Sequence, residues 1–400
     1  MEFKPLFVFI ALGAAAVSIA RAGERAAIAP DSTASSTPAG IRYLITNDDP
    51  PPKIPTSSTL FTLAPNGLPQ DPTRVSLGGV GAGGGYFAAS RVSVLRSTTS
   101  ACAFLSIGGS GEISAVDLHT QRNVGDFSAA PTDSGLSNGI GLVNNAAYLY
   151  ASFSSSNTLA TFSVLPDCGL RFLGDISPQG KHQGNVKGMA LHGDMLVVAY
   201  GEGSIESFNI SAGIPVSNDD LQNATGYATD RFPSGVDISP DGRYAIFGDM
   251  STTTTVEVSD ISGGKLKKTR LYNLGPANDA SNVLFSPDGS LIYIANTGSG
   301  KVTAAFFDRE TGKVSRGCVS PTLKGFDRTW VFLASPVTEQ TNGTGSVLYL
   351  AEFGSPSSIA VIDVTSSGGQ CTLTEKPASP VIAPNTNVLL SIGMYPPRPF

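Results

Sequence analysis

Three residues in the middle of the chain have side chains that could hydrolyse a cyclic ester: His182, Lys187 and Glu202. That reaction needs a base to activate water and a positive group to stabilise the oxyanion that forms on the carbonyl. We expect His182 or Glu202 to be the catalytic base and Lys187 to hold negative charge on the substrate. The alternative is that these residues are simply solvated, because His182 and its neighbour Lys181 stand in a polar, glycine-containing loop.

A second set of candidates stands beside predicted strands. Asp249 and Glu352 each follow an apolar run, and Arg328 lies just before another. We expect these three residues to bind substrate, although Arg328 could instead pair with its neighbour Asp327.

The position after the second strand of each repeat is often acidic. Its seven occupants are Asp48, Gly108, Ser152, Glu202, Asp249, Asn296 and Glu352, and four of these are carboxylates. On one rim they would make a negative mouth suited to a cation or a basic ligand. The alternative is that Asp and Asn only suit the turns at strand ends.

These positions belong to a repeat of short apolar runs joined by tight turns. Ser-Pro-Asp-Gly begins at Ser239 and again at Ser286, and 286 − 239 = 47. Gly188 and Gly235 begin matching runs at the same spacing, since 235 − 188 = 47. Pro presets the backbone of a type I turn, and Gly tolerates the position that follows. A repeat of this length and character predicts an all-β fold, a β-propeller.

The number of blades follows from counting the copies. Six copies cover about residues 91–375, and the two ends supply one more. Segments 41–47 and 58–63 are typical of middle strands, and segment 387–393 is typical of an inner strand. We therefore predict a seven-bladed β-propeller whose last blade is closed by N- and C-terminal strands, which also removes exposed sheet edges. Six or eight blades are the alternatives, because the first three copies are degenerate.

Composition excludes several classes of function. Of the 400 residues 41% are hydrophobic and 14% are charged, and the net charge is −6. Nucleic-acid binding needs clustered Lys and Arg, so we expect no nucleic-acid partner. The chain has no Cys-x-x-Cys, no P-loop and no His-Glu-x-x-His motif. We therefore predict no metal site and no cofactor.

The N-terminus is typical of a targeting segment. An apolar run at 6–20 is followed by Ala20-Arg-Ala, the small-x-small pattern of a cleavage site. We predict a signal peptide at 1–22, a flexible linker at 23–40 and a single propeller domain at 41–400. An uncleaved membrane anchor is the alternative. The mature protein is expected to be a monomer without a membrane span, in an extracytoplasmic (periplasmic or secreted) location.

Four cysteines allow three pairings, and export permits disulfides. We favour Cys318 with Cys371, since both fall at the ends of successive repeats. Four unpaired or buried thiols are the alternative.

Two runs point to a family. Ile292-Tyr-Ile-Ala-Asn-Thr-Gly-Ser-Gly-Lys-Val and Phe307-Asp-Arg-Glu-Thr-Gly-Lys-Val resemble the YVTN-repeat, lactonase-like seven-bladed propellers, a WD40-like architecture. That family includes 6-phosphogluconolactonase-type enzymes, in which a His, an Arg and a Glu near the channel mouth are implicated. The resemblance implies that His182 and Glu202 fill two of these roles. Lys187 stands where an Arg is expected, and Lys lacks the planar two-point grip of Arg on a carboxylate or phosphate.

Two functions follow from these patterns. The first is a binding or interaction module that holds a small-molecule or protein ligand at the channel mouth without catalysis. The second, implied by the resemblance, is hydrolysis of a sugar-type lactone. Turnover of a lactone by the purified protein would separate them.

Overall fold

The computed structural model describes residues 42–397, except 83–89, 98, 130–139, 155, 183–185, 202, 224–231, 251–252, 268, 278, 326–332, 341–344, 354–355 and 384–388. The described residues belong to one compact unit, Gly40–Phe400. No helix among them has the length and apolar run needed to cross a bilayer.

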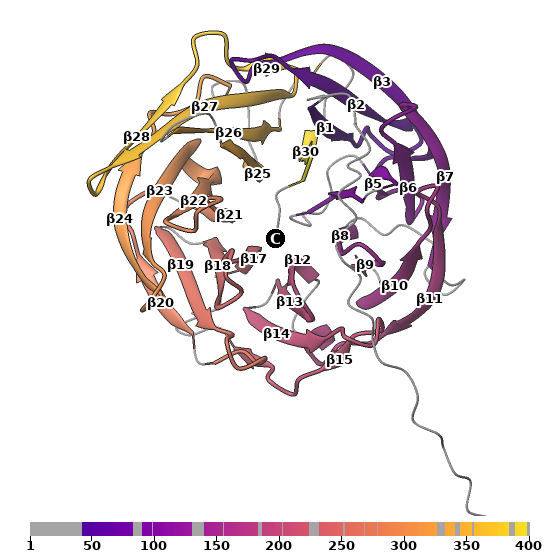
Figure 1. Cartoon of the computed structure of the whole chain (residues 1–400), viewed down its shortest axis with the longest axis horizontal. Coiled ribbons are helices and arrows are strands. Elements are labelled where there is room, and N and C mark those ends of the chain that lie inside the picture. Colours follow the sequence, from indigo (N-terminus) through magenta and orange to yellow (C-terminus); the bar gives the residue numbers. More distant parts are fainter. Residues whose placement is uncertain are drawn as a thin grey trace, which may run out of the picture. The chain divides into compact units, whose positions relative to one another are not determined.

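Seven antiparallel sheets stand in a ring, each forming one blade of a propeller (Figure 1). We name the blades A to G and list their strands from the ring axis outward. Blade A has β30 (Leu389–Tyr395), β1 (Tyr43–Asp48), β2 (Pro55–Leu63) and β3 (Pro69–Val80). Blade B has β4 (Val92–Arg96), β5 (Ala101–Ile107), β6 (Glu112–Asp117) and β7 (Arg122–Ser128). Blade C has β8 (Ile140–Asn144), β9 (Tyr148–Phe153), β10 (Thr158–Val164) and β11 (Leu170–Ile176).

Blade D has β12 (Val186–His192), β13 (Met195–Tyr200), β14 (Ser204–Asn209), and two short outer strands, β15 (Val216–Ser217) and β16 (Gln222–Asn223). Blade E has β17 (Phe232–Ile238), β18 (Tyr244–Met250), β19 (Thr254–Asp260) and β20 (Arg270–Asn273). Blade F has β21 (Ala280–Phe285), β22 (Leu291–Asn296), β23 (Lys301–Asp308) and β24 (Lys313–Val319). Blade G has β25 (Leu333–Gln340), β26 (Gly345–Glu352), β27 (Ser358–Ser367), β28 (Gln370–Glu375) and β29 (Val381–Ile382). The predicted seven-bladed, all-β fold is confirmed.

The repeated Ser-Pro-Asp-Gly turn shows why this sequence forms hairpins. In blade E the Ser239 hydroxyl donates to the Asp241 carboxylate (2.6 Å) and accepts from the Tyr244 backbone N–H (3.0 Å). Gly242 has a positive φ of 69°, which glycine adopts without steric conflict. In blade F, Ser286, Asp288 and Leu291 repeat these contacts at 2.6 and 2.9 Å. Each turn therefore fixes the register of the inner and second strands.

Both ends of the described chain contribute to blade A, as predicted. The C-terminal β30 is its inner strand and pairs with β1, for example Tyr43 with Tyr395. Each inner strand also contacts the inner strands of both neighbouring blades, so these contacts close into a complete circle.

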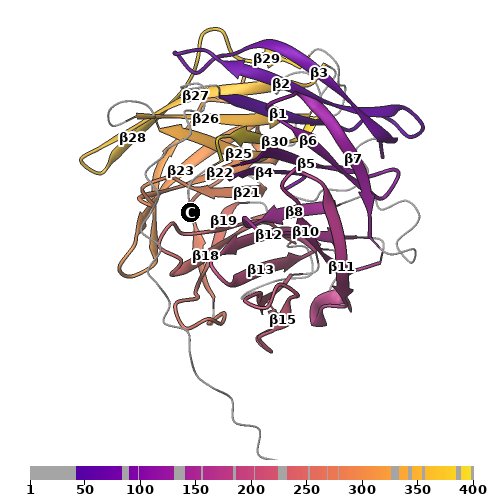
Figure 2. The ribbon, with the colours of Figure 1, turned by 45° about the vertical axis from the view of Figure 1, so that its right-hand side comes forward.

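The core lies between the blades. Its described residues fall into seven clusters, one for each interface between neighbouring blades. At the interface of blades G and A, for example, Tyr349 and Val361 pack against Leu44 and Phe61. The view in Figure 2 shows neighbouring sheets lying face against face. Alternate residues of a middle strand therefore face the preceding and the following blade.

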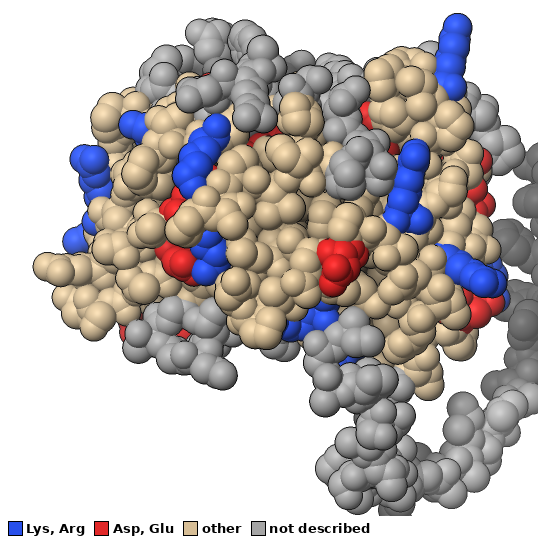
Figure 3. All heavy atoms as spheres, turned by 90° about the horizontal axis from the view of Figure 1, so that it is seen from above, with Lys and Arg blue, Asp and Glu red and all other residues tan. Residues whose placement is uncertain are grey.

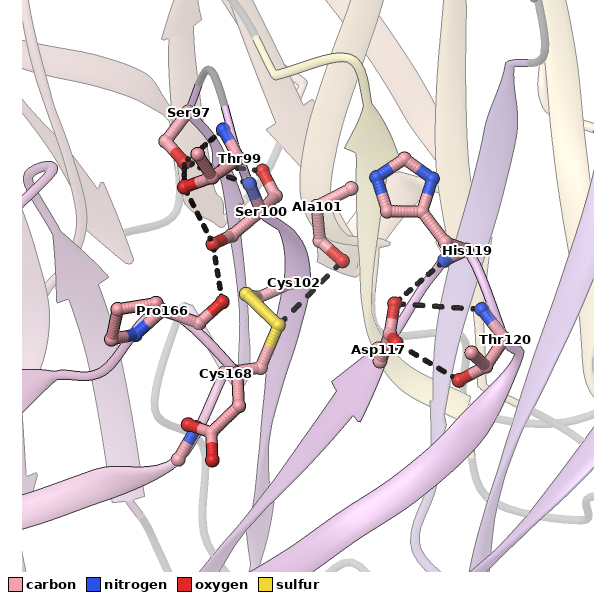
Figure 4. Close-up of a disulfide and its surroundings, with 12 residues drawn as sticks. Ser97, Thr99, Ser100, Ala101, Cys102, Asp117, His119, Thr120, Pro166 and Cys168 are labelled. Carbon is pink, nitrogen blue, oxygen red and sulfur yellow. Dashed lines mark hydrogen bonds between the residues drawn. A yellow bond between two sulfur atoms is a disulfide. The ribbon is translucent and has the colours of Figure 1, made fainter. Parts of the chain in front are cut away.

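Two disulfides tie neighbouring blades together. Cys318 on β24 bonds to Cys371 on β28, which confirms the predicted pair and joins blades F and G. Cys102 on β5 bonds to Cys168, in the turn before β11, and joins blades B and C (Figure 4). Beside this second bridge, the Ser100 hydroxyl donates to the Pro166 carbonyl (2.6 Å), so the seam has a hydrogen bond as well as a covalent link.

Candidate functional site

One end of the ring collects most of the predicted site residues. Inner and second strands are antiparallel, so the start of each inner strand lies beside the end of its second strand. We call this side of the ring the entry end. Lys187 lies at the start of inner strand β12, and Asp249 and Glu352 lie at the ends of second strands β18 and β26. All three residues are therefore at the entry end.

Five inner strands change register close to the entry end. One extra residue is inserted on β12, β17, β21, β25 and β30, whereas β4 and β8 pair without a shift. In blade D, Val186 pairs with Tyr200 and Gly188 pairs with Ala199, which leaves Lys187 as the extra residue. An inserted residue bends the strand and re-aims its side chain. Lys187 therefore departs from the regular alternation of β12.

The environment of Lys187 changes its acidity. Its side chain is partly buried. Burial disfavours the charged form and lowers the pKa of the Lys187 ammonium to about 8. At neutral pH this side chain is a cation in a partly desolvated place, where its charge acts on a bound anion more strongly than it would in water.

The structurally equivalent ends of the second strands differ from those counted in the sequence. They are the residues that end each second strand, or in blade E precede its end: Asp48, Ile107, Phe153, Tyr200, Asp249, Asn296 and Glu352. Ile107, Phe153 and Tyr200 thus replace Gly108, Ser152 and Glu202 of the sequence-based set. The polar members come from the consecutive blades E, F, G and A, and the larger apolar and aromatic members come from B, C and D.

The four polar members are buried between blades, so they do not form an open acidic mouth. None is more than 1% exposed. Asp48 accepts hydrogen bonds from the hydroxyls of Thr46 (2.6 Å), Ser57 (3.1 Å) and Thr59 (2.9 Å), and burial raises its pKa. This carboxylate is satisfied by its own blade.

Asn296 and Glu352 are also held in place by neighbouring side chains. Asn296 accepts from Thr254 of blade E (2.7 Å) and donates to Thr303 of its own blade (2.9 Å). Glu352 accepts from Ser358 (2.5 Å). Gly325 passes directly over Glu352, because a Cβ at that glycine would lie 2.0 Å from Oε2. These contacts assign both side chains a structural task at the joints between blades.

Of the other predicted site residues, the structure describes only the backbone of His182. The backbone of His182 ends the short 3₁₀ helix η2 (Gln179–His182), which leads from blade C to the start of β12. Glu202 and Arg328 lie outside the described residues. His182 thus precedes Lys187 by five residues in the chain, and the roles of His182, Glu202 and Arg328 stay proposals.

The two remaining histidines lie away from this end. His192 is at the opposite end of β12, five residues from Lys187, or roughly 17 Å along an extended strand. His119 is in an exposed turn after β6, also at the opposite end. Among the three histidines of the chain, only His182 belongs to a connection at the entry end.

Sequence reasoning missed a buried ion pair and a further buried carboxylate at this end. Arg91 precedes inner strand β4, is fully buried, and forms an ion pair with Asp49 (2.6 Å). The sequence did contain a signal for Arg91. It is an Arg just before an inner strand, the kind of position at which the family resemblance implied an Arg in blade D. Glu206 on β14 is also fully buried. Its only signal was a charged residue within a short predicted strand, between Ile205 and Phe208.

Charge is spread thinly over the surface. On the face shown in Figure 3, the described Lys and Arg side chains are scattered, some of them beside Asp or Glu, and form no continuous basic patch. Across the part of the chain that the structure describes, no group of three or more His, Cys, Asp or Glu is arranged to hold a metal ion.

The comparisons with known proteins agree with this architecture. The family model described as "Lactonase, 7-bladed beta-propeller" matches residues 97–386. No curated protein sequence matches this chain significantly. Among solved structures, the periplasmic gluconolactonase PpgL of Pseudomonas aeruginosa is similar, with a TM-score of 0.66 and 14% identity over 89% of this chain and 99% of that one.

Two further structures share the fold. Candidate 6-phosphogluconolactonases from Bacteroides uniformis and Bacteroides fragilis have TM-scores of 0.62 and 0.63 at 14% and 15% identity. They cover 88% and 90% of this chain and 99% of their own length. Identities this low show the fold alone. The family match spans 290 of the 400 residues (386 − 97 + 1), so the chain belongs to the lactonase family of seven-bladed β-propellers.

Proposed function

We propose that this protein hydrolyses a sugar-type lactone at the entry end of the ring. Its family and the gluconolactonase names of three structural neighbours support this proposal better than they support a binding module without catalysis. The observation that carries it is the placement of Lys187. An inserted, partly buried lysine with a lowered pKa is unusual in a strand and is suited to act on a reacting group.

The proposed reaction uses few groups. Water attacks the lactone carbonyl, and the acyl C–O bond to the ring oxygen then breaks, so that the ring oxygen leaves as a hydroxyl and a carboxylate remains. The ammonium of Lys187 stabilises the oxyanion of the tetrahedral intermediate. His182 or Glu202 takes the proton of the attacking water. Arg328, Asp249 and Glu352 remain proposed substrate contacts, although Asp249 and Glu352 would need their blade joints to open.

The same proposal places the protein outside the cytoplasm. All four cysteines are paired in two disulfides, and such bonds persist in oxidising compartments. A signal peptide at 1–22 would deliver the chain there. The periplasmic location named for the Pseudomonas aeruginosa neighbour is consistent with this assignment.

The direct test is turnover of glucono-1,5-lactone and its 6-phosphate, corrected for spontaneous hydrolysis. Lys187→Met should lower kcat/KM by about 10²–10³, because it removes an oxyanion-stabilising charge. Its Tm at pH 7 should equal or exceed that of the wild type, since a partly buried charge is removed. Lys313→Met, an exposed lysine on outer strand β24, is the matched control and should leave turnover unchanged.

Two results would overturn the proposal. Full turnover by Lys187→Met would remove Lys187 from the reaction. Failure of the wild type to accelerate hydrolysis of any sugar lactone, with measurable binding of one, would favour the binding module instead.

A further inference from the structure

Glu206 is a fully buried carboxylate that the proposed reaction does not use. Its Oε2 accepts from the Tyr200 hydroxyl (2.8 Å) and from the backbone N–H of Gly180 (3.1 Å). Its Oε1 accepts from the Ser217 hydroxyl (2.9 Å). Three donors from three separate segments therefore meet on one side chain.

Two of these donors flank Lys187. Tyr200 is the strand partner of Val186, the residue immediately before Lys187. Gly180 belongs to η2, which precedes β12 in the chain. A Cβ at Gly180 would lie 2.3 Å from the Tyr200 ring, so η2 packs tightly on this tyrosine. Glu206 thus fixes both the strand beside Lys187 and the segment leading into it.

The outer edge of blade D is built to support the same carboxylate. Where the other blades have a longer fourth strand, blade D has only the two-residue segments β15 and β16. Ser217, the last residue of β15, donates to Glu206, and the segment that follows it supports η2. That segment presents Asp219, whose carboxylate accepts from the side chain of Gln179 (2.6 Å) and gives η2 a second anchor.

We propose that Glu206 is a positioning residue that, through Tyr200 and η2, holds the inserted Lys187 in its partly buried place at the entry end. The proposal rests on the function proposed above for the reaction, but the position of Lys187 can be measured without any substrate.

The test follows the acylation of Lys187 by mass spectrometry as a function of pH. In the wild type the labelling midpoint should lie near 8, the value to which burial lowers this pKa. In Glu206→Ala it should rise by about one pH unit or more toward the ordinary lysine value of about 10.4. The midpoint of the exposed Lys313 should stay constant in every variant and serves as the internal reference.

Glu206→Gln is the conservative control. Its amide oxygen can accept from Tyr200 and Gly180 while its NH₂ faces the Ser217 hydroxyl, so both the midpoint and kcat/KM should stay near those of the wild type. Glu206→Ala should lower kcat/KM for the lactone roughly tenfold to a hundredfold, as expected for a displaced group. Tyr200→Phe removes a single donor, keeps the aromatic packing, and should move the midpoint in the same direction by less.

The outcomes separate the two proposals. An unmoved midpoint in folded Glu206→Ala overturns the positioning role, and if that variant does not fold, an unmoved midpoint in Tyr200→Phe does so. A moved midpoint together with full turnover by Lys187→Met supports the positioning role and rejects Lys187 as part of the reaction.

Discussion

At the residue scale, the protonation state of Lys187 decides what it can do. Burial lowers its pKa to about 8, so it is largely charged at pH 7 and largely neutral at pH 9. A charge that stabilises an oxyanion is therefore lost as the pH rises through 8, whereas a base with a lower pKa stays active over the same range.

We predict that kcat/KM for a sugar lactone falls above pH 8, approaching a tenfold loss per pH unit. Lys187→Arg should remove this alkaline loss, because a guanidinium stays charged across the range. The measurement is a pH profile from 6 to 9 with the spontaneous rate subtracted. An identical alkaline limb in wild type and Lys187→Arg would show that another group titrates.

Asp48 illustrates a buried carboxylate with a structural task. Burial raises its pKa, so the folded state favours the protonated form. The stability this gives is fully present below about pH 3.9, the ordinary pKa of Asp, and is lost as the pH rises through the folded pKa.

We therefore expect Asp48→Asn to have a Tm at pH 7 equal to or above that of the wild type, with a smaller difference at pH 4. The amide keeps an acceptor for the surrounding hydroxyls. Asp48→Ala should lose about 1–3 kcal/mol, because it leaves those hydroxyls unsatisfied. If thermal unfolding gave equal losses for both variants, a charge on Asp48 would be required by the fold.

At the element scale, the hairpin turns could be predicted from the sequence and the register shifts could not. The turns at Ser239 and Ser286 depend on contacts within five residues, so the local sequence specifies them. The inserted residue at Lys187 depends on how β12 pairs with β13, and no residue type in Val186–Gly188 signals it. The equivalents at Ile107 and Phe153 were missed for a different reason, because the local sequence does not fix the residue at which a second strand ends. An error of one position changes which blade the side chain faces.

The two disulfides differ in burial, which predicts a difference in reactivity. Cys102 and Cys168 are at most 2% exposed, whereas Cys318 and Cys371 are partly exposed. A mild reductant acting on the folded protein should open Cys318–Cys371 first. Alkylation and peptide mapping would show this order, and simultaneous labelling of all four cysteines would contradict it.

Loss of the bond between blades F and G should also reduce stability. Cys318→Ser with Cys371→Ser is expected to lose about 2–4 kcal/mol, since the bond closes a loop of 53 residues in the unfolded chain. Denaturant unfolding of the oxidised wild type and the double variant provides the comparison. Equal unfolding midpoints for the two proteins would mean that packing alone holds blades F and G together.

At the scale of the whole molecule, a buried ion pair lies where the N-terminal and C-terminal strands of the ring meet. Arg91 pairs with Asp49, which follows β1, and the Arg91 backbone N–H donates to Ser391 of the C-terminal β30 (3.2 Å). Blade B, the N-terminal strand and the C-terminal strand therefore meet at Arg91.

We predict that Arg91→Met destabilises the protein by about 3–5 kcal/mol, because it leaves the Asp49 carboxylate buried without its cation. The double variant Arg91→Met with Asp49→Leu should recover much of that loss. Chemical denaturation of the three proteins is the measurement. A double variant no more stable than Arg91→Met would show that the pair also fixes a geometry that apolar side chains do not replace.

Because the inner strand of blade A, β30, comes from the C-terminal part of the chain, it determines when the ring can close. Strands β1 to β3 precede the other strands of the ring in the chain, and they lack their inner neighbour until β30 has been synthesised. The circle therefore cannot close before β30 has been synthesised. The edge of β1 that faces the ring axis therefore stays unpaired while the strands of the other six blades are made.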